Sequence, residues 1–275
     1  MRIEEILRSE KELPRVDLVA IVSCALGLTP EGVMAAPERM LDAAEADAIE
    51  RLIEERRRGK PLAYITNRRE FFSETFYVDE GVLIPRPETE LLVEEAVELI
   101  RQRGPLRVLD VGTGSGIIGL LLAKAGARSV LCVDISPAAL AVADRNARAM
   151  GVREMIDFVA SDLCSALKKE GLFDLICANL PYVAASEWEG LMKDVRGFEP
   201  KSALVAGPTG TEAYERLIAD APGRLAPGGS LLLEIGGEAQ AASLGALLRD
   251  AGFGTAVSRD LAGRERLLRG SWTSS

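Results

Sequence analysis

Apolar residues recur along this chain with two different periods, and the change falls near residue 70. In the first part they are spaced three or four positions apart, as in the series Leu41, Ala44 and Ala48, which places them on one face of a helix. From Leu106 onward, short runs of apolar and β-branched residues alternate with helical stretches. The pattern predicts a small helical bundle followed by a larger α/β domain.

Capping residues indicate where the helices of the first part begin and end. Thr29 suits an N-cap, because its side-chain oxygen can accept a hydrogen bond from the first turn, and Pro30 fits the first helical position. The strongly apolar segment RVDLVAIVSCALGL predicts a helix that ends near Gly27. Gly59 follows an arginine-rich segment and marks the end of another helix.

The stretch between the two parts has the composition of strands. EFFSETFYVDEGVLI carries aromatic and β-branched residues around Asp79–Gly81, so we expect a β-hairpin that turns at this DEG sequence. PRPETELLVEEAVELI then predicts a helix with an acid-rich first turn. The expected organisation is a helical domain over residues 1–70, a hairpin and linker over 71–88, and an α/β domain over 89–275.

Seven strands are expected in the α/β domain. Two form a hairpin in the tail FGTAVSRDLAGRERLLRG, and five are short apolar segments: RVLDVG, SVLCVD, IDFVAS, FDLICAN and SLLLEIG. Repeated strand–helix units of this length form a parallel sheet covered by helices on both faces. The predicted fold class is therefore α/β, with a seven-stranded Rossmann-like sheet.

Composition narrows the possible chemistry. The 275 residues include no histidine, which excludes Ser-His-Asp and Cys-His catalysis, histidine acid–base catalysis and histidine-ligated metals. We expect reduced thiols rather than disulfides or a zinc site, because no two of the four cysteines form a close pair in the sequence: Cys24, Cys132, Cys164 and Cys177. No apolar run is long enough to cross a bilayer, and the charged N-terminus is unlike a signal peptide. A cytoplasmic location without membrane association is expected.

Charge is distributed unevenly along the chain. The net charge of −9 disfavours stable, nonspecific binding to nucleic acid, which requires a broad basic surface. A local exception is the run EERRRGK at residues 54–60, followed by Arg68 and Arg69. Such a run suits the carboxyl end of a solvated helix, with a contact surface as the alternative.

A glycine-rich turn follows the first strand of the α/β domain. VLDVGTGSGIIG places Gly112, Gly114 and Gly116 where the strand passes into a helix, and glycine lets the backbone approach a ligand closely. Asp110 precedes this turn, and its carboxylate suits a cationic amino group better than a pyrophosphate. The spacing is G-x-G-x-G, whereas the nicotinamide-binding fingerprint is G-x-G-x-x-G.

Two further strands of the α/β domain end in an aspartate. Asp134 comes about twenty residues after the glycines, where a carboxylate can accept hydrogen bonds from both ribose hydroxyls. Asp162 ends the third strand and could accept a hydrogen bond from an adenine amino group. Each aspartate alone could instead be a helix N-cap. All three with the glycine turn indicate a nucleoside with a zwitterionic tail, namely S-adenosylmethionine.

The fourth strand ends in Asn-Leu-Pro-Tyr, within LICANLPYVAA. Taken alone, this could be a strand followed by a proline turn. With the cofactor motifs, however, the sequence resembles the amino-methyltransferases, whose motif is [Asn/Asp/Ser]-Pro-Pro-[Tyr/Phe/Trp]. Within that group it resembles the peptide chain release factor glutamine methyltransferases. The resemblance covers nearly the whole chain and includes GKPLAYITNRREFF, VLIPRPETELLVE, DVRGFEPKSALVAGPTG, LLLEIG and RDLAGRERLL.

This resemblance implies a specific reaction. The enzyme would transfer a methyl group from S-adenosylmethionine to the glutamine of the Gly-Gly-Gln motif of release factors, yielding S-adenosylhomocysteine without a metal. The N-terminal helices would dock the release factor. IPRPETE would form a lid over the cofactor, with a rigid proline linker as the alternative. Glu199 and Pro200 are expected to shape the wall of the pocket.

The residues of the motif have separable roles toward a substrate amide. The Asn179 side-chain oxygen and the Leu180 carbonyl can each accept one N–H of the amide, which fixes its plane. Pro181 holds the backbone, and Tyr182 packs against the amide. Leu180 stands where the family motif has proline, but its carbonyl is retained, so we expect activity.

The expected site residues form two groups. Those expected to bind substrate are Asn179, Leu180, Pro181 and Tyr182, of which Asn179, Pro181 and Tyr182 are assigned to catalysis. Those expected to bind the cofactor are Asp110, Gly112, Thr113, Gly114, Ser115, Gly116, Asp134, Asp162, Leu163 and Asn179. Two other functions are kept as alternatives: an amino-methyltransferase acting on adenine or guanine in nucleic acid, and a non-catalytic adapter.

Overall fold

Two compact units make up the part of the chain that the computed structural model describes, residues 1–170 and 172–273. The first unit contains Met1–Arg68 together with Met192–Phe198. The rest of the described chain forms the second unit, beginning at Arg69. Within the described residues, no helix is both long and apolar enough to span a membrane. All four cysteines are free thiols.

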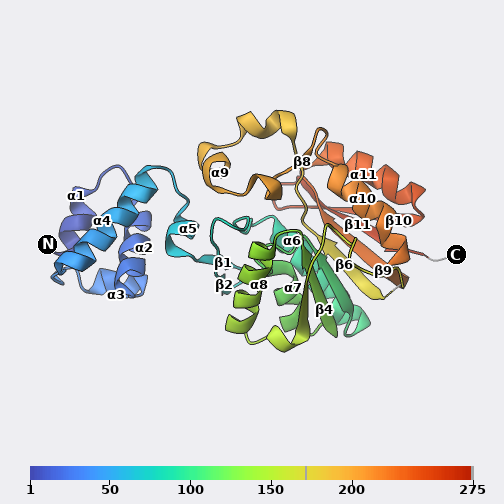
Figure 1. The fold of residues 1–275 in the computed structure, drawn as a ribbon, viewed down its shortest axis with the longest axis horizontal. Coiled ribbons are helices and arrows are strands. Elements are labelled where there is room, and N and C mark those ends of the chain that lie inside the picture. Colours follow the sequence, from blue (N-terminus) through green and yellow to red (C-terminus); the bar gives the residue numbers. More distant parts are fainter. Residues whose placement is uncertain (171, 274–275) are drawn as a thin grey trace. The chain divides into compact units, whose positions relative to one another are not determined.

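The first unit is helical, as the sequence predicts (Figure 1). Thr29 caps a helix by accepting a hydrogen bond from the Gly32 amide, with Pro30 at the first helical position, so both predictions are confirmed. Buried Leu18, Ile21 and Ile49 lie in its core. Its helices are α1 (Ile3–Ser9), α2 (Arg15–Leu26), α3 (Pro30–Ala35), α4 (Ala43–Arg57), α5 (Leu62–Thr66) and α9 (Lys193–Phe198).

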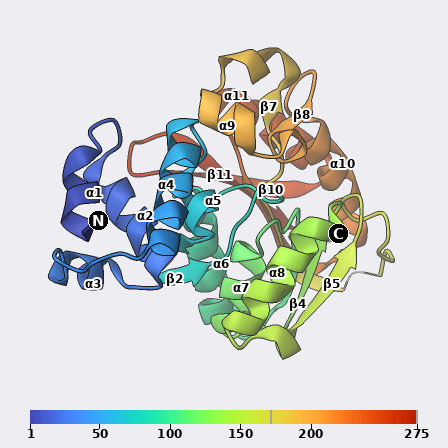
Figure 2. The ribbon, with the colours of Figure 1, turned by 60° about the vertical axis from the view of Figure 1, so that its left-hand side comes forward.

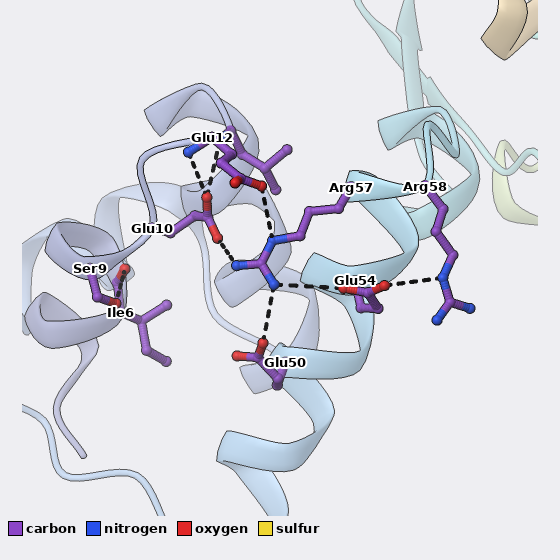
Figure 3. Close-up of polar contacts among 9 residues, drawn as sticks. Ile6, Ser9, Glu10, Glu12, Glu50, Glu54, Arg57 and Arg58 are labelled. Carbon is purple, nitrogen blue, oxygen red and sulfur yellow. Dashed lines mark hydrogen bonds and ion pairs between the residues drawn. The ribbon is translucent and has the colours of Figure 1, made fainter.

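The basic run at the end of α4 is paired with acidic residues of the same unit. Arg57 donates a hydrogen bond to Glu10, whose other carboxylate oxygen accepts the Glu12 amide at 2.7 Å (Figure 3). Arg58 instead pairs with Glu54 on its own helix, at 3.1 Å. Arg57 thus links the α1–α2 connection to α4, which fits a structural helix end better than a basic contact surface.

A two-stranded hairpin opens the second unit, but its turn is not where the sequence pattern indicated. β1 (Arg69–Phe71) pairs with β2 (Glu74–Phe76), and the turn consists of Phe72 and Ser73, with φ of 51° and 62°. Asp79–Gly81 does form a turn, in which the Val82 amide donates to the Asp79 carbonyl at 3.1 Å, but this turn follows the hairpin and does not close it, so the predicted position of the hairpin turn was wrong. Positive φ at both positions of a two-residue turn is typical of a type I′ hairpin turn, which usually favours Asn or Gly. Here Phe71 and Phe76 are both buried, and the strand register that places them there leaves Phe72 and Ser73 to form the turn.

The main sheet of the second unit has seven strands in the order β10-β11-β9-β6-β3-β4-β5. All seven predicted strands are confirmed, including the terminal hairpin, whose second strand pairs antiparallel with both β10 and β9. The strands are β3 (Arg107–Val111), β4 (Ser129–Asp134), β5 (Ile156–Ala160), β6 (Phe173–Ala178), β9 (Leu225–Glu234), β10 (Phe253–Arg259) and β11 (Glu265–Trp272). Short β7 (Val183–Ala184) and β8 (Val205–Gly207) pair separately.

Helices cover both faces of this sheet (Figures 1 and 2). Alternation along β3 sends Val108 into one apolar cluster and Leu109 into the other. Helices α6 (Thr89–Arg103), α7 (Ile117–Lys124) and α8 (Pro137–Ala149) contribute to the first cluster, and α10 (Glu212–Asp220) and α11 (Glu238–Asp250) contribute to the second. In the described part of the chain, four 3₁₀ helices lie at Arg153–Met155, Ala185–Gly190, Lys201–Ala203 and Ala221–Gly223.

The strand order reverses between β3 and β6. From β3 the chain proceeds outward to β4 and β5, and from β6 it proceeds the other way to β9. Val111, the last residue of β3, pairs with Ala178, the last residue of β6. The loops that follow these two strands therefore begin side by side, at the position where doubly wound sheets bind ligands.

The contacts of Arg57 predict its effect on the helical unit. Arg57→Gln should speed hydrogen exchange in the α1–α2 connection, because the variant loses the cation that joins Glu10 to α4. Arg58→Gln is the matched control and should exchange like the parent, since Arg58 pairs within one helix. Exchange followed by mass spectrometry on the full chain measures both variants. Equal exchange in the two variants would contradict this role.

Candidate functional site

A cavity of about 540 Å³ lies at the carboxyl ends of the parallel strands. It brings together most of the residues that the sequence singled out, from four different loops. The predicted site residues that line it are Gly112, Thr113, Gly114, Ser115, Asp134, Asp162, Leu163, Asn179, Leu180 and Pro181. Three others, Asp110, Gly116 and Tyr182, are not among the described residues that line it.

The glycine turn adopts a backbone conformation that requires glycine. Gly112, Gly114 and Gly116 have φ of 72°, 55° and 87°, which side chains rarely tolerate. The Gly114 amide donates to one carboxylate oxygen of Asp134, and the Ser136 amide donates to the other, both at 2.9 Å. Asp134 therefore fixes the turn and also presents its carboxylate at the cavity wall.

Asp110 lies beneath the turn rather than on its surface. It is fully buried, and one carboxylate oxygen accepts the Thr113 hydroxyl at 2.6 Å and the Gly119 amide at 3.0 Å. Burial raises the pKa of Asp110 to about 6, although these hydrogen bonds lower it. In the structure Asp110 holds the turn against the first turn of α7; contact with a ligand's amino group stays a prediction.

Asp162 forms an ion pair with a basic residue of α10 at the cavity wall. Its carboxylate accepts a hydrogen bond from Arg216 at 2.7 Å, and both side chains remain about half exposed, at 48% and 57%. Both residues line the cavity. The adjacent Leu163 has φ of 50°, a conformation uncommon for leucine. An adenine-binding role for Asp162 stays a prediction, and Arg216 is a neighbour that the sequence did not suggest.

The orientation of the Asn179 amide is set by neighbours on two other elements. Its Nδ2 donates to Oγ1 of Thr89, the first residue of α6, at 3.1 Å. The carboxyl of Glu234 at the end of β9 lies near both side chains, which lower its pKa. Because the Asn179 NH₂ group donates to Thr89, the Asn179 Oδ1 is left available as an acceptor.

Glu234 is a buried acid that the sequence analysis did not assign to the site. Its exposed fraction is 2%, and its Oε2 has no hydrogen-bond partner among the described residues. Burial raises the pKa of Glu234 from 4.5 to about 7, although the neighbouring Thr89 and Asn179 side chains lower it. Nearby Glu88 raises the pKa further, and Arg266 lowers it.

Leu180 contacts the glycine turn directly. A Cβ placed on Gly112 would come within 2.8 Å of Leu180 Cδ2, so the two motifs pack against each other. Tyr182 packs instead on the apolar cluster beneath α10 and α11, and its carbonyl accepts a hydrogen bond from Gln240 at 2.9 Å. Packing of the Tyr182 ring on a substrate amide stays a prediction.

The segment that carries IPRPETE is tied to the residues after α9. Glu199 is 5% exposed and accepts hydrogen bonds from Arg86 at 2.5 Å and from the Ile84 amide at 3.2 Å. Pro85, Arg86 and Pro200 line the cavity. Glu199 therefore anchors Arg86, which lines the cavity, while its wall-shaping role stays a prediction.

Three buried polar residues near Asn179 were missed: Thr89, Tyr214 and Glu234. Glu234 could have been found, since it ends a strand in an acid, as Asp134 does. Thr89 and Tyr214 gave no comparable signal, because they lie 90 and 34 residues away from the positions they contact.

Comparison with known proteins adds family information to this geometry. A model described as "Methyltransferase domain" matches residues 108–198, and one described as "PrmC N-terminal domain" matches residues 2–66. A release factor glutamine methyltransferase of Nitratidesulfovibrio vulgaris is 41% identical over 94% of this chain and 89% of its own length. One from Bordetella pertussis is 39% identical over 96% of this chain and 97% of its own length.

Solved structures support the fold. The catalytic domain of hMettl16, crystallised with a MAT2A 3′UTR hairpin, matches with a TM-score of 0.60 at 19% identity, over 78% of this chain and 81% of that one. A ribosomal protein L11 methylase from Lactobacillus delbrueckii subsp. bulgaricus matches with a TM-score of 0.51 at 24% identity, over 68% of this chain and 80% of that one. Both likenesses concern the α/β fold.

The pKa of Glu234 predicts a pH-dependent stability. The unfolded carboxyl titrates near 4.5 and the folded one near 7, so between these values the unfolded state has lost a proton that the folded state keeps. The free energy of unfolding should therefore fall as pH rises through this window and level off above it. Between about pH 5.5 and 8, the contribution of Glu234 is about 2 kcal/mol.

Glu234→Gln should remove this part of the pH dependence. Urea unfolding of parent and variant at both pH values measures how far the free energy of unfolding changes with pH in each protein. Asp110 is present in both proteins, so its contribution to this change cancels in the comparison. Glu238→Gln is the control, because the side chain of Glu238 is 75% exposed. The same loss of stability with rising pH in the parent and in Glu234→Gln would refute the prediction.

Proposed function

Because this chain belongs to the family of release factor glutamine methyltransferases, we propose that Asn179 and Leu180 orient the side-chain amide of a release-factor glutamine for N-methylation. The substrate residue would be the glutamine of the Gly-Gly-Gln motif. The observation that carries this proposal is the fixed Asn179 amide, whose NH₂ group is taken by Thr89 and whose oxygen is left to accept.

The cavity residues fit S-adenosylmethionine, the methyl donor of this class of enzyme. The glycine turn brings main-chain atoms to the cavity without Cβ atoms in the way, and Asp134 offers a carboxylate to ribose hydroxyls. Asp162 and Leu163 are assigned to the adenine, and Asp110 to the amino group, which it would reach through Thr113. The product would be S-adenosylhomocysteine, and the proposal requires no metal.

The main task of this chain is orientation. An amide nitrogen is a poor nucleophile because its lone pair is delocalised into the carbonyl. Asn179 Oδ1 and the Leu180 carbonyl would each accept one N–H, so that the nitrogen faces the methyl group in line with the leaving sulfur. When bound, the cofactor supplies a methyl group on a positively charged sulfur. Pro181 would restrict Leu180 to extended backbone, and Tyr182 would exclude water from the amide.

Docking of the release factor is assigned to the helical unit. The match of residues 2–66 to the PrmC N-terminal domain supports this assignment, as do three exposed apolar side chains, Val16, Met34 and Met40, at 71%, 49% and 65% exposure. Met40→Asp should raise the KM for the release factor about fivefold or more with kcat unchanged, as expected for lost uniform binding. An unchanged KM would contradict the docking assignment.

Transfer of label tests the proposed function. The purified chain is incubated with S-adenosylmethionine labelled in its methyl group, and with either a release factor or a mixture of RNA and DNA. Label should appear in the release factor, and mass spectrometry should place it on the glutamine of the Gly-Gly-Gln motif. Label in nucleic acid but not in protein would favour the alternative, methylation of adenine or guanine. Cofactor binding without transfer to either would favour an adapter.

Asn179→Ala tests the mechanism in the same assay. The variant should lose at least about a hundredfold in kcat, because one of the two acceptors that fix the amide is absent. Cofactor affinity, measured by calorimetry, should stay within about tenfold of the parent. Thr89→Val keeps Asn179 but removes its hydrogen-bond partner, and a smaller loss is expected. Turnover of Asn179→Ala within tenfold of the parent would contradict the orienting role.

A further inference from the structure

The Tyr214 hydroxyl contacts both polar main-chain atoms of Leu180. Tyr214 lies on α10 and is fully buried. Its oxygen is 3.0 Å from the Leu180 nitrogen, 3.0 Å from the Leu180 oxygen and 2.6 Å from the Glu234 carbonyl oxygen. Burial raises the pKa of Tyr214 well above its ordinary value, so the hydroxyl keeps its proton.

The hydroxyl has one proton to donate and two carbonyls within reach. It accepts the Leu180 N–H and donates most directly to the Glu234 carbonyl, which is the nearer of the two. The Leu180 carbonyl then keeps its lone pairs for a ligand in the cavity that Leu180 lines. The hydrogen bond from its N–H to Tyr214 restricts rotation about the Leu180 N–Cα bond.

Leucine at position 180 has two structural requirements that proline would not have. A proline ring fixes φ and has no N–H, whereas Leu180 has no ring to fix φ and has a buried N–H that must find an acceptor. Tyr214 meets both requirements with one oxygen atom. The Leu180 nitrogen is outside the β-ladder, since β6 ends at Ala178. In the described chain, its N–H donates to this hydroxyl.

We propose that Tyr214 is a positioning residue for methyl transfer, which fixes the Leu180 carbonyl through the Leu180 N–H and so replaces the rigidity of the motif's first proline. The proposal rests on the proposed function, in which that carbonyl accepts an N–H of the substrate amide. Tyr214 itself touches neither substrate nor cofactor in this scheme, because it is fully buried and is not among the described residues that line the cavity.

A double-mutant cycle tests this role in the full chain. Tyr214→Phe should lower kcat about tenfold or more, with the KM for the release factor and the cofactor Kd within about twofold of the parent. In the Leu180→Pro background, the same change should lower kcat at most about threefold, because no N–H is left to satisfy. Loss of the bond to the Glu234 carbonyl is common to both backgrounds and cancels.

Two controls separate the N–H from other effects. Leu180→Ala removes the side chain that packs on Gly112 but keeps the N–H, so Tyr214→Phe should again cost about tenfold in that background. Tyr77→Phe removes a hydroxyl from a tyrosine that does not line the cavity, and its kcat should match the parent. An equal loss on Tyr214→Phe in the parent, in Leu180→Ala and in Leu180→Pro would overturn the proposal.

Amide exchange gives a readout that does not depend on methyl transfer or on the folding of Leu180→Pro. Exchange of the Leu180 N–H, followed by NMR in the parent, should become about tenfold faster or more in Tyr214→Phe. Unchanged exchange would overturn the proposal even where the parent methylates release factor. Failure of the parent to methylate release factor would instead refute the proposed function, while the exchange result would still decide whether Tyr214 fixes Leu180.

Discussion

β3 and β6 pair in parallel. Val108 lies opposite Leu175 and Val111 lies opposite Ala178, so both strands leave the sheet at the same edge and at the same level. The relative positions of the loops that form the site depend on this pairing. It brings the glycine turn, which begins at Gly112, against Leu180, close enough that a Cβ on Gly112 would meet the leucine side chain at 2.8 Å. A register shift of one residue in either strand would move every side chain of the motif to the opposite face.

Buried polar groups turn this shared edge into an ordered site. Asp110, Asp134 and Glu234 each end or nearly end a strand, and the carboxylates of Asp110 and Asp134 accept hydrogen bonds from the loops beside them. Burying such groups is unfavourable, as the raised pKa values of Asp110 and Glu234 indicate. The Thr113 hydroxyl and the Gly119 amide offset this penalty at Asp110, and the bond from Asn179 to Thr89 fixes the Asn179 amide, so that little ordering is left for the moment of binding.

The sequence predicts those features that depend on local pattern. Apolar runs indicated all seven strands, and the glycines and Asp134 followed from their place at strand ends. The hairpin turn was predicted at the wrong position because burial of Phe71 and Phe76 sets a register that turns at Phe72 and Ser73, while Asp79–Gly81 forms a separate turn after the hairpin. Thr89 and Tyr214 could not be predicted, since their contacts with Asn179 and Leu180 arise only when α6 and α10 pack at the sheet edge.

Leu180 shows how a main-chain role constrains sequence. A residue that acts through its carbonyl can vary its side chain, provided that the carbonyl stays in place and no buried N–H is left without a partner. Proline satisfies both conditions by itself. Leucine satisfies them only where a hydroxyl such as that of Tyr214 lies within hydrogen-bond distance of its nitrogen. The tolerance for leucine in this motif is therefore a property of α10, thirty-four residues away, and not of the motif alone.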